Sequence, residues 1–342
     1  MKGPVVLYGG VEGGGTHSTT ILLNQEGEKV AMVEGPSTNI YQIGLEETCS
    51  RIRSMVTECL VVGGYPESTV LEGLGLSLSG CEREETNTSL VAMMVNNYPR
   101  LARHYEVCSD TVGTLYTASD DGGVVLIAGT GSNALLVNPD KSVFRCGGWG
   151  HYLGDEGGAW WIAHKACKVY FDHLDNMENA VADIHTLQQV IFTHFNIRDR
   201  FGILEHCYDK FSKAYFASLT VKISEAAFAG DDLCRWLFRE AGKKLGRHIR
   251  ALDNNISKDL REAEGGLNIL CVGSVWKSWE LLKTGFMEGL KDMTGKPCLA
   301  EFTMVKLSVS MATGAAYLGA KAAGTLIPRN QENVEKFFSF KH

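Results

Sequence analysis

Short apolar runs separated by glycine-rich turns open the chain, and this pattern favours strands over helices. The run VVLYGGVE is followed by the turn GGGTHS, the run TTILLN and a second turn, QEGE. β-Branched and aliphatic residues in runs of this length are typical of strands. The pattern therefore predicts a β-hairpin over residues 5–24, with Gly14, Gly15 and Thr16 at its tip.

The same arrangement returns in the stretch GVVLIAGTGSNALLVNPDKSV, which covers residues 123–143. Aligning Gly15-Thr16 with Gly129-Thr130 also places Ser18 on Ser132 without a gap, and a turn follows each apolar run. Two such hairpins, each of which begins a new block of chain, indicate one phosphate-clamping lobe that has been duplicated.

Elsewhere apolar residues recur at the spacing of one helix face. A long amphipathic helix is predicted directly after CGGWGHYLGDEGG, from the spacing of Trp160, Ala163, Cys167, Tyr170 and Leu174. Further helices are predicted in TVGTLYTA, in AYFASLTVKISEAA, in the Trp279–Phe286 stretch and in the Ala/Gly-rich MATGAAYLGAKAAG. Strand-like runs, HYEVCSD and LNILCV, alternate with them, which predicts an α/β protein.

Composition and charge narrow the class of protein. A chain of 342 residues exceeds what one hydrophobic core commonly organises, so two lobes are expected. The net charge of -7, without a clustered Lys/Arg run, argues against nucleic-acid binding. The start MKGPVVLYGG lacks an apolar signal core, and no apolar stretch approaches the roughly 20 residues of a membrane span. We therefore expect a cytoplasmic protein without membrane contact.

The ten cysteines are scattered, and no two lie closer than Cys49 and Cys59. This spacing excludes close-spaced zinc knuckles. Because no export signal is seen, the cysteines are interpreted as reduced thiols that serve as small buried hydrophobes.

Two familiar phosphate-binding devices do not match the hairpins. A Walker loop needs a lysine after its last glycine, but Thr16-His17 follow Gly15. GTGSNA fits a dinucleotide fingerprint as letters, yet a short apolar strand follows it where a helix should begin. Backbone amides at the hairpin tips are the remaining way to hold a polyphosphate. The first hairpin alone is equally compatible with a plain glycine-rich turn; the second favours a nucleotide clamp.

Asp110 ends the strand-like run HYEVCSD and precedes a predicted helix. A carboxylate at the carboxyl end of a strand is where α/β folds commonly place chemistry, and it is suited to accept a proton from a hydroxyl nucleophile. Aspartate is also a favoured helix N-cap. The residues alone leave these two roles at equal weight.

The block CGGWGHYLGDEGG sets Trp149, His151, Asp155 and Glu156 among glycines. Carboxylates and amides in a tight loop beside a flat apolar wall suit the hydroxyl groups of a sugar. The acidic pair would also complement the dipole of the following helix, which is the structural alternative. For His151, a metal ligand role is less favoured than a hydrogen-bonded histidine, because no second His or Cys lies at ligand spacing.

Two further loops carry candidate residues. GPSTNIYQIG contains Asn39, whose amide offers both a donor and an acceptor, although the loop also suits a turn that caps a helix starting near Gly44. LNILCVGSVWKSWELL reads as a buried strand, a turn at Gly273-Ser274 and a helix, where glycine would let the backbone approach a ligand.

The segments VEGGGT, GLSLSG, SD, IAGTGSN, CGGWGHYLGDEGG and LCVGSVWKSWELL, in this order, resemble those of the N-acetylglucosamine kinases in the actin/hexokinase/Hsp70 ATPase superfamily. The resemblance runs from Tyr8 to about Gly324. It implies a two-lobed, actin-like (ribonuclease H-like) α/β fold, with duplicated mixed β-sheets and a central cleft. It also implies ATP and Mg²⁺ as cofactors and a homodimer.

The resemblance assigns roles residue by residue. Asp110 becomes the catalytic base. The residues implied at N-acetylglucosamine are Asn39, Asp110, Ser132, Asn133, Gly148, Trp149, Gly150, His151, Tyr152 and Asp155. The residues implied at ATP are Gly14, Gly15, Thr16, Thr130, Ala217, Gly273 and Ser274. Glu12 stands where the superfamily has Asp, so its role near Mg²⁺, through water, competes with a purely structural one.

These observations predict a small lobe over residues 2–120, joined by the segment 325–342, and a large lobe over 121–324. The expected activity is ATP-dependent phosphorylation of N-acetyl-D-glucosamine at its 6-hydroxyl, with larger N-acylated amino sugars as further substrates. A different class, an ATP-driven clamp or activator of the same superfamily, would have no need for the Trp149–Asp155 cluster. A sugar-responsive repressor is disfavoured because no DNA-binding domain precedes the first hairpin.

Overall fold

The computed structural model of the protein describes residues 6–342, which build one β-sheet of five strands and another of six. Contacts divide the chain into two units. Unit 1 comprises the described part of residues 1–123 together with 305–337, and unit 2 comprises 124–304 and 338–342. Lys2 and Val5, the predicted starts of the small lobe and of the first strand, lie outside the described residues.

Unit 1 is built on a mixed sheet of order β3-β2-β1-β4-β5. Its strands are β1 (Tyr8–Gly13), β2 (His17–Leu23), β3 (Lys29–Pro36), β4 (Leu71–Leu78) and β5 (Ala102–Cys108). β1 pairs antiparallel with β2, from Tyr8 opposite Leu23 to Gly13 opposite Ser18, which confirms the first predicted hairpin. β1 pairs parallel with β4, and β4 with β5, so the carboxyl ends of these three strands share one edge.

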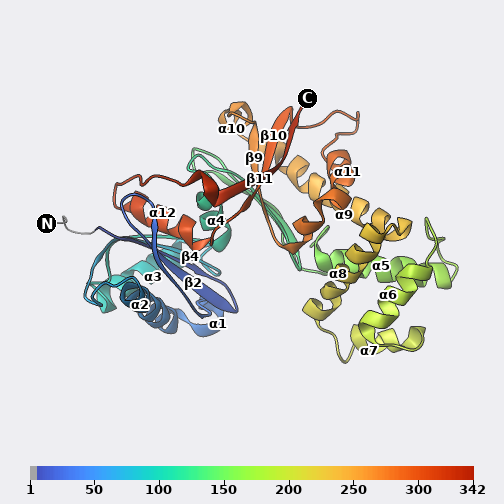
Figure 1. Cartoon of the computed structure of the whole chain (residues 1–342), viewed down its shortest axis with the longest axis horizontal. Coiled ribbons are helices and arrows are strands. Elements are labelled where there is room, and N and C mark those ends of the chain that lie inside the picture. Colours follow the sequence, from blue (N-terminus) through green and yellow to red (C-terminus); the bar gives the residue numbers. More distant parts are fainter. Residues whose placement is uncertain (1–5) are drawn as a thin grey trace. The chain divides into compact units, whose positions relative to one another are not determined.

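Helices cover both faces of this sheet (Figure 1). They are α1 (Ile40–Ile43), α2 (Leu45–Val62), α3 (Glu84–Asn97), α4 (Asp110–Ala118) and α12 (Ala312–Ala322). α12 packs on β1 and β4 with backbone close to backbone: a Cβ atom on Gly10 would lie 2.1 Å from the Ala312 oxygen, and one on Gly75 1.8 Å from the Ala315 oxygen. The Ala/Gly-rich sequence of α12 and the glycines of the sheet therefore serve one close contact.

Unit 2 carries most of the second sheet, of order β11-β10-β9-β6-β7-β8, in which residues 305–307 of β10 and 334–337 of β11 are grouped with unit 1. Its strands are β6 (Gly123–Ala128), β7 (Ser132–Val137), β8 (Val143–Gly147), β9 (Leu267–Val272), β10 (Glu301–Leu307) and β11 (Val334–Lys341). β6 and β7 are hydrogen-bonded neighbours joined by a three-residue turn, which confirms the second predicted hairpin. β6 runs parallel to β9, whereas β7 and β8 are antiparallel.

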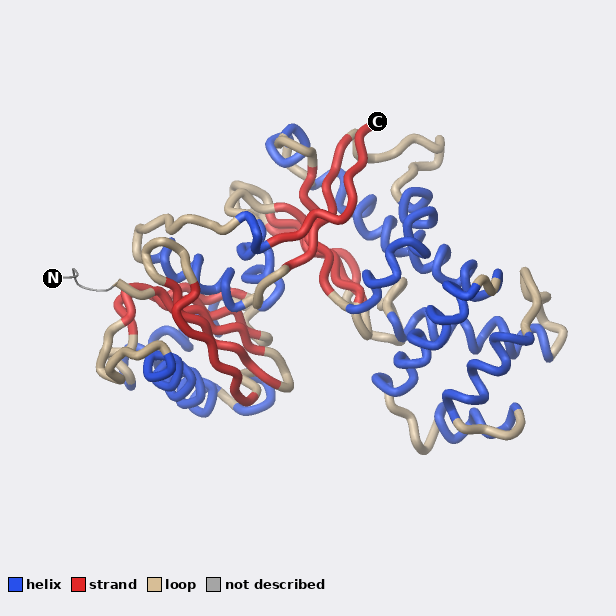
Figure 2. The backbone as a smooth tube through the Cα atoms, in the orientation of Figure 1, coloured by secondary structure: helices blue, strands red, loops and turns tan. Residues whose placement is uncertain are grey.

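The rest of unit 2 is helical (Figure 2). Its helices are α5 (Ala159–Leu174), α6 (His185–Phe195), α7 (Ile203–Cys207), α8 (Lys213–Ala229), α9 (Asp232–Leu252), α10 (Lys258–Glu262) and α11 (Trp279–Gly289). α9 buries one face against α11 and its neighbours, with Leu237, Leu245 and Ile249 fully buried. α5, α8 and α11 lie where the sequence predicts helices.

The contact units differ from the predicted lobes at the C-terminal end of the chain. α12 was assigned to the large lobe, but it packs on the sheet of unit 1. Of the segment 325–342, predicted to join the small lobe, residues 325–337 belong to unit 1 and only 338–342 belong to unit 2. There the ring of Phe338 lies 5.0 Å from that of Trp279 and 5.9 Å from that of Phe302. The apolar tail thus finds cover from aromatic rings that are distant in the sequence.

Among residues 6–342, no helix combines the length and the apolarity needed to span a bilayer. All ten cysteines are free, and six of them are buried. Burial raises the pKa of Cys49 to about 11 and that of Cys59 to about 12, so these thiols stay protonated near neutral pH. The prediction of small buried hydrophobes thus holds for the six buried cysteines; Cys108, Cys146 and Cys298 are half-buried, and Cys207 is exposed.

Candidate functional site

The tip of the first hairpin is held by side chains from the loop that follows β3. Within the tip, the Gly14 amide donates to the His17 carbonyl over 3.1 Å, and the Ser37 hydroxyl donates to the Gly14 carbonyl over 2.9 Å. A Cβ atom on Gly13 would lie 1.8 Å from Thr38 Oγ1, so only glycine fits there. Gly15 and Thr16 themselves are exposed, so this hairpin presents its tip to solvent.

Asp110 is the first residue of α4, but it is not the helix cap. Ser109 occupies the cap position, and its hydroxyl accepts from the Val112 amide. The Asp110 carboxylate is held otherwise: Oδ2 accepts from the Ser79 hydroxyl over 2.6 Å, and Oδ1 accepts from the Thr111 amide over 2.7 Å. The capping alternative therefore belongs to Ser109, which leaves Asp110 oriented by bonds of its own.

The charge of the Asp110 carboxylate affects the pKa of Glu12, which lies on β1. Burial is the largest cause that raises the pKa of Glu12, and repulsion from Asp110 raises it further, while His17 partly offsets both. Two carboxylates that repel each other are suited to a divalent cation. Mg²⁺ is commonly held by one or two carboxylates with waters and substrate phosphates. The described residues contain no cluster of three His, Cys, Asp or Glu, and the Glu12–Asp110 pair fits this sparser kind of site.

Asn39 caps the short helix α1 through its side-chain oxygen, which accepts from the Tyr41 amide over 2.9 Å. Asn39 thus caps α1, a short helix that the sequence did not predict. The predicted helix near Gly44 is α2, which begins at Leu45 with Gly44 as its N-cap and no side-chain cap bond. The cap uses only the oxygen of the Asn39 side chain, so the amide group is not required for it.

The tip of the second hairpin is bonded to the start of α5. The Ala159 amide donates to the Gly129 carbonyl over 2.8 Å, and the Trp160 amide donates to the Thr130 carbonyl over 3.0 Å. The first amides of a helix lack partners within it, so the hairpin carbonyls satisfy them. The Ser132 hydroxyl donates to the Glu156 carbonyl over 2.8 Å and ties β7 to the same region.

A pocket of about 470 Å³ in unit 2 brings together three residues predicted to contact ATP: Thr130, Ala217 and Ser274. Gly273 adjoins it with φ 110°, and a Cβ atom there would lie 2.4 Å from the Ala128 carbonyl oxygen. The pocket has apolar walls, including Val221, and a size common for small-molecule sites.

The loop over residues 147–155, which we call the sugar loop because it contains the predicted sugar residues 148–152 and 155, is shaped by glycines in the left-handed region. Gly147, Gly148 and Gly150 have φ between 75° and 80°, and the Gly148 amide donates to the Ser132 carbonyl over 3.1 Å. The loop exposes two aromatic side chains, Trp149 at 70% and Tyr152 at 88%.

Asp155 closes this loop in an unusual state. It is buried, its φ is 63°, and its Oδ1 accepts from the Ser132 amide over 3.2 Å, while Oδ2 accepts from Lys213 Nζ over 2.8 Å. α5 starts only at Ala159, with no acidic residue in its first turn. The helix-dipole alternative therefore does not account for Asp155.

Two polar atoms of the predicted site are buried without a hydrogen-bond partner among the described residues: Asn133 Oδ1 and His151 Nε2. The His151 ring instead packs among aromatic rings, 4.2 Å from that of Tyr152 and 5.6 Å from that of Phe211. The hydrogen-bonded histidine that the sequence favours is thus not seen at Nε2. Unpartnered buried polar atoms are costly, and they are suited to receive a ligand.

Sequence reasoning missed two side chains that hold the predicted residues. Ser79 lies in the GLSLSG segment, which was noted only as part of the resemblance, and it donates to Asp110. Lys213 precedes the AYFASLTVKISEAA helix, and no local pattern marks it as the partner of Asp155.

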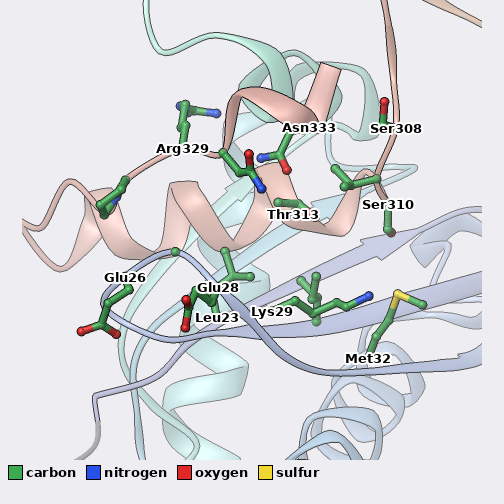
Figure 3. Close-up of a pocket in the computed structure, with 15 residues that line it drawn as sticks. Leu23, Glu26, Glu28, Lys29, Met32, Ser308, Ser310, Thr313, Arg329 and Asn333 are labelled. Atoms are coloured by element: carbon green, nitrogen blue, oxygen red, sulfur yellow. The ribbon is translucent and has the colours of Figure 1, made fainter. Parts of the chain in front are cut away.

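A larger pocket, of about 630 Å³, lies within unit 1 and is lined by none of the predicted residues (Figure 3). Figure 3 shows Lys29 and Met32 from β3 below, and Thr313 and Asn333 above. The Asn333 amide donates to the Tyr317 hydroxyl over 2.8 Å, so this side chain is engaged within the unit. Because none of its lining residues is predicted to contact ATP or the sugar, this pocket is not part of either predicted site.

Comparisons with known proteins identify a family and several similar kinases. The model of the BadF/BadG/BcrA/BcrD ATPase family matches residues 10–319. The chain is 25% identical over 267 residues to an N-acetyl-D-glucosamine kinase of Dictyostelium discoideum, covering 75% of this chain and 82% of that one. It is 24% identical over 246 residues to an N-acetylmuramic acid/N-acetylglucosamine kinase of Clostridium acetobutylicum, covering 71% and 78%.

Among solved structures, the fold is similar to that of a candidate N-acetylglucosamine kinase from Chromobacterium violaceum, with a TM-score of 0.63 at 22% identity. The match covers 92% of this chain and 99% of that one. The predicted fold class, α/β with two lobes on mixed sheets, is confirmed, and so is the resemblance to N-acetylglucosamine kinases.

Proposed function

Because the chain belongs to the BadF/BadG/BcrA/BcrD ATPase family, we propose that it phosphorylates N-acetyl-D-glucosamine on the 6-hydroxyl group with ATP. The observation that carries the proposal is the state of Asp110. Ser109 caps α4, so the Asp110 carboxylate does not serve as the helix cap. Hydrogen bonds from Ser79 and Thr111 orient this carboxylate, and its charge acts on Glu12. The names of relatives at 24–25% identity support the amino-sugar substrate.

In this proposal Asp110 accepts the proton of the sugar 6-hydroxyl as that oxygen forms its bond to phosphorus. ATP supplies the phosphoryl group, and ADP leaves. Because the hairpins lack a Walker lysine, charge compensation falls to backbone amides at the two tips, to threonine hydroxyls and to Mg²⁺. The residues assigned to the phosphates are Gly14, Gly15, Thr16 and Thr130.

The adenosine part of ATP is assigned to the pocket lined by Ala217 and Ser274, where Gly273 lets the backbone come close. Glu12 is assigned to the Mg²⁺ shell through water, since its carboxylate lies within the field of Asp110. This assignment uses the repulsion between the two groups, which a divalent cation would relieve.

The resemblance assigns the sugar to Asn39, Asp110, Ser132, Asn133 and the loop that begins at Gly148. Asn133 Oδ1 is a buried acceptor without a partner among the described residues, so it is suited to an N–H or hydroxyl donor of the sugar. The Ser132 hydroxyl donates to Glu156, and its oxygen can still accept. The remaining assigned loop residues are Gly148, Trp149, Gly150, His151, Tyr152 and Asp155.

A substrate panel tests the proposal. ADP release is measured with N-acetylglucosamine, glucosamine, N-acetylmuramic acid and glucose, and without sugar. We expect the highest kcat/KM with an N-acylated amino sugar. Glucose should lose about 5- to 150-fold, which corresponds to about 1–3 kcal/mol for a polar site left without its partner. Equal kcat/KM for glucose would instead indicate a general hexokinase.

The same panel separates the alternative class. An ATP-driven clamp or activator would release ADP at a rate that no sugar changes. A cytoplasmic location and a homodimer remain predictions of the sequence, and the second is checked by the mass of the purified protein in light scattering.

A further inference from the structure

We propose that Lys213 is a positioning residue that holds Asp155 for sugar binding, and that α8 thereby links the sugar loop to the nucleotide pocket. The inference rests on the proposed function, because it takes Asp155 as a sugar ligand. It concerns unit 2 alone, since both residues, α8 and the pocket belong to that unit.

The first step is the cost of holding Asp155 in place. Its side chain is only 6% exposed, so the carboxylate has lost most of its hydration, and its left-handed backbone is uncommon for a residue with a side chain. Lys213 Nζ and the Ser132 amide compensate at 2.8 and 3.2 Å. A Cβ atom on Gly131 would lie 2.5 Å from Asp155 Oδ1, so the carboxylate also packs closely against the turn that precedes β7.

The second step is that Lys213 is out of place by local rules. It is the first residue of α8, where the helix dipole disfavours a cation. Ser212 already caps the helix, since its hydroxyl accepts from the Tyr215 amide. The helix therefore does not require Lys213, whose side chain is 34% exposed while that of Asp155 is buried. The ion pair with Asp155 explains why a lysine occupies this position.

The third step is a second contact from the same segment. Residues 208–213, which we call the strap, comprise the connection from α7 and the first residue of α8. Within the strap, the Phe211 ring stacks 5.6 Å from the His151 ring at an interplanar angle of 28°. The strap thus contacts the sugar loop at His151 through an aromatic ring and at Asp155 through a charge.

The fourth step follows α8 onward from Lys213. One and two turns later, Ala217, Ser218 and Val221 line the pocket assigned to adenosine. Thr220 donates through its hydroxyl to the Ala159 carbonyl over 2.6 Å, at the start of the helix that holds the second hairpin tip. One helix therefore carries the holder of Asp155 at its end and the pocket wall along its side.

A helix that contacts both ligands gives their binding a shared structural basis. If nucleotide binding fixes α8, Lys213 fixes Asp155, and the sugar then binds more tightly. By linkage, sugar must tighten nucleotide binding by the same factor. The coupling requires the Lys213–Asp155 pair.

The test uses Lys213→Met, which removes the charge at similar length, and Lys213→Arg, which keeps it. Lys210→Met is the matched control, because Lys210 lies in the same strap but pairs with Glu205 where both side chains are 63% exposed. For each protein we measure kcat, both KM values and the thermal midpoint. Sugar affinity is measured by calorimetry with and without a non-hydrolysable ATP analogue.

We expect Lys213→Met to raise the sugar KM about tenfold or more, the scale of one charge-assisted hydrogen bond, and to bring the coupling factor toward one. Lys213→Arg should restore most of the sugar affinity, and Lys210→Met should behave as the wild type. If Lys213→Met is unfolded, Lys213→Gln takes its place, with the same expectation.

An unchanged sugar KM in a folded Lys213→Met protein overturns the inference, as does an equal loss in Lys210→Met. A raised sugar KM with an unchanged coupling factor overturns the link through α8. A wild-type protein that phosphorylates no amino sugar overturns the proposed function instead, so the two failures are distinguishable.

Discussion

The two hairpin tips of this protein share one sequence pattern but are anchored in different ways. The first tip is held by side chains: the Ser37 hydroxyl bonds Gly14, and Thr38 fills the space beside Gly13. The second tip is held by backbone, because the first two amides of α5 donate to its carbonyls. Equivalent glycine-threonine pairs are thus held by loop side chains in unit 1 and by the first amides of a helix in unit 2.

Their charged surroundings differ more. Glu12 and Asp110 lie in each other's field in unit 1, and their repulsion contributes to a raised pKa of Glu12. In unit 2 the Asp155 carboxylate accepts from the Ser132 amide beside the second tip and is paired with Lys213. The same motif is therefore suited to different roles by the residues around it. The two carboxylates near the first tip, Glu12 and Asp110, suit proton and metal chemistry, whereas the Lys213–Asp155 ion pair near the second tip suits ligand binding.

The largest expected effect concerns Asp110. Asp110→Asn keeps the size of the side chain but removes the proton acceptor, so kcat should fall about 10²–10⁴-fold. The thermal midpoint should hold, because Ser109 caps α4.

Ser109→Ala is the matched control for Asp110. It should lower the free energy of unfolding by about 1 kcal/mol through loss of the cap, and it should leave kcat nearly unchanged. Enzyme kinetics and thermal melts of the two variants should therefore show opposite patterns. Full activity of a folded Asp110→Asn protein would show that Asp110 is not the catalytic base.

The next effect sharpens the difference in anchoring. A Cβ atom on Gly158 would lie 2.7 Å from the Gly131 carbonyl carbon, which is backbone and cannot turn away, whereas one on Gly129 would meet nothing within 4 Å. Gly158→Ala should cost about 1–3 kcal/mol of unfolding free energy through overpacking. Gly129→Ala should cost much less. Chemical denaturation measures both, and equal stability of the two variants would contradict the close fit at the second tip.

A third prediction concerns the pocket beside the second tip. Ser218 is exposed and lines the pocket, so Ser218→Phe should occupy part of it and raise the KM for ATP about tenfold, or about 1.4 kcal/mol. The sugar KM, measured at saturating ATP, should change much less. Lys222→Phe, on the same helix but outside the pocket lining, is the control. An unchanged KM for ATP in Ser218→Phe would place the adenosine elsewhere.

The smallest effect concerns Glu12 and depends on pH. Its pKa is raised from 4.5 in the folded protein, so the folded state holds this proton more tightly than the unfolded chain does. Stability is therefore lost as the pH rises through the window above 4.5, and the loss persists at higher pH. Glu12→Gln should raise the thermal midpoint by about one degree near pH 8 and leave it unchanged near pH 4. A rise of equal size at both pH values would contradict the raised pKa of Glu12.

Local patterns predicted the elements of the site well. The hairpins follow from short apolar runs with turns, and α5, α8 and α11 follow from helical spacing. Placing Thr130, Ala217 and Ser274 around one pocket needed the resemblance, because no local pattern singles out an alanine on a helix.

What the sequence did not reveal depends on contacts between distant residues. Lys213 and Asp155 are 58 residues apart, and Ser79 and Asp110 are 31 apart. The choice between Ser109 and Asp110 as the cap of α4 depends on one residue of helix phase, which propensity does not decide, since both types are good caps. Residues 338–342 differ from the prediction for the tail, because the sequence does not reveal that Trp279 and Phe302 cover Phe338.

The central claim is that the protein transfers the γ-phosphoryl group of ATP to the 6-hydroxyl of N-acetylglucosamine, with Asp110 as the base that accepts the hydroxyl proton. Phosphorus NMR of the purified protein with ATP, Mg²⁺ and N-acetylglucosamine tests it most directly. The account predicts one sugar 6-phosphate for each ADP formed, and no such signal with Asp110→Asn. ADP accompanied only by inorganic phosphate, at a rate that the sugar does not change, would contradict it.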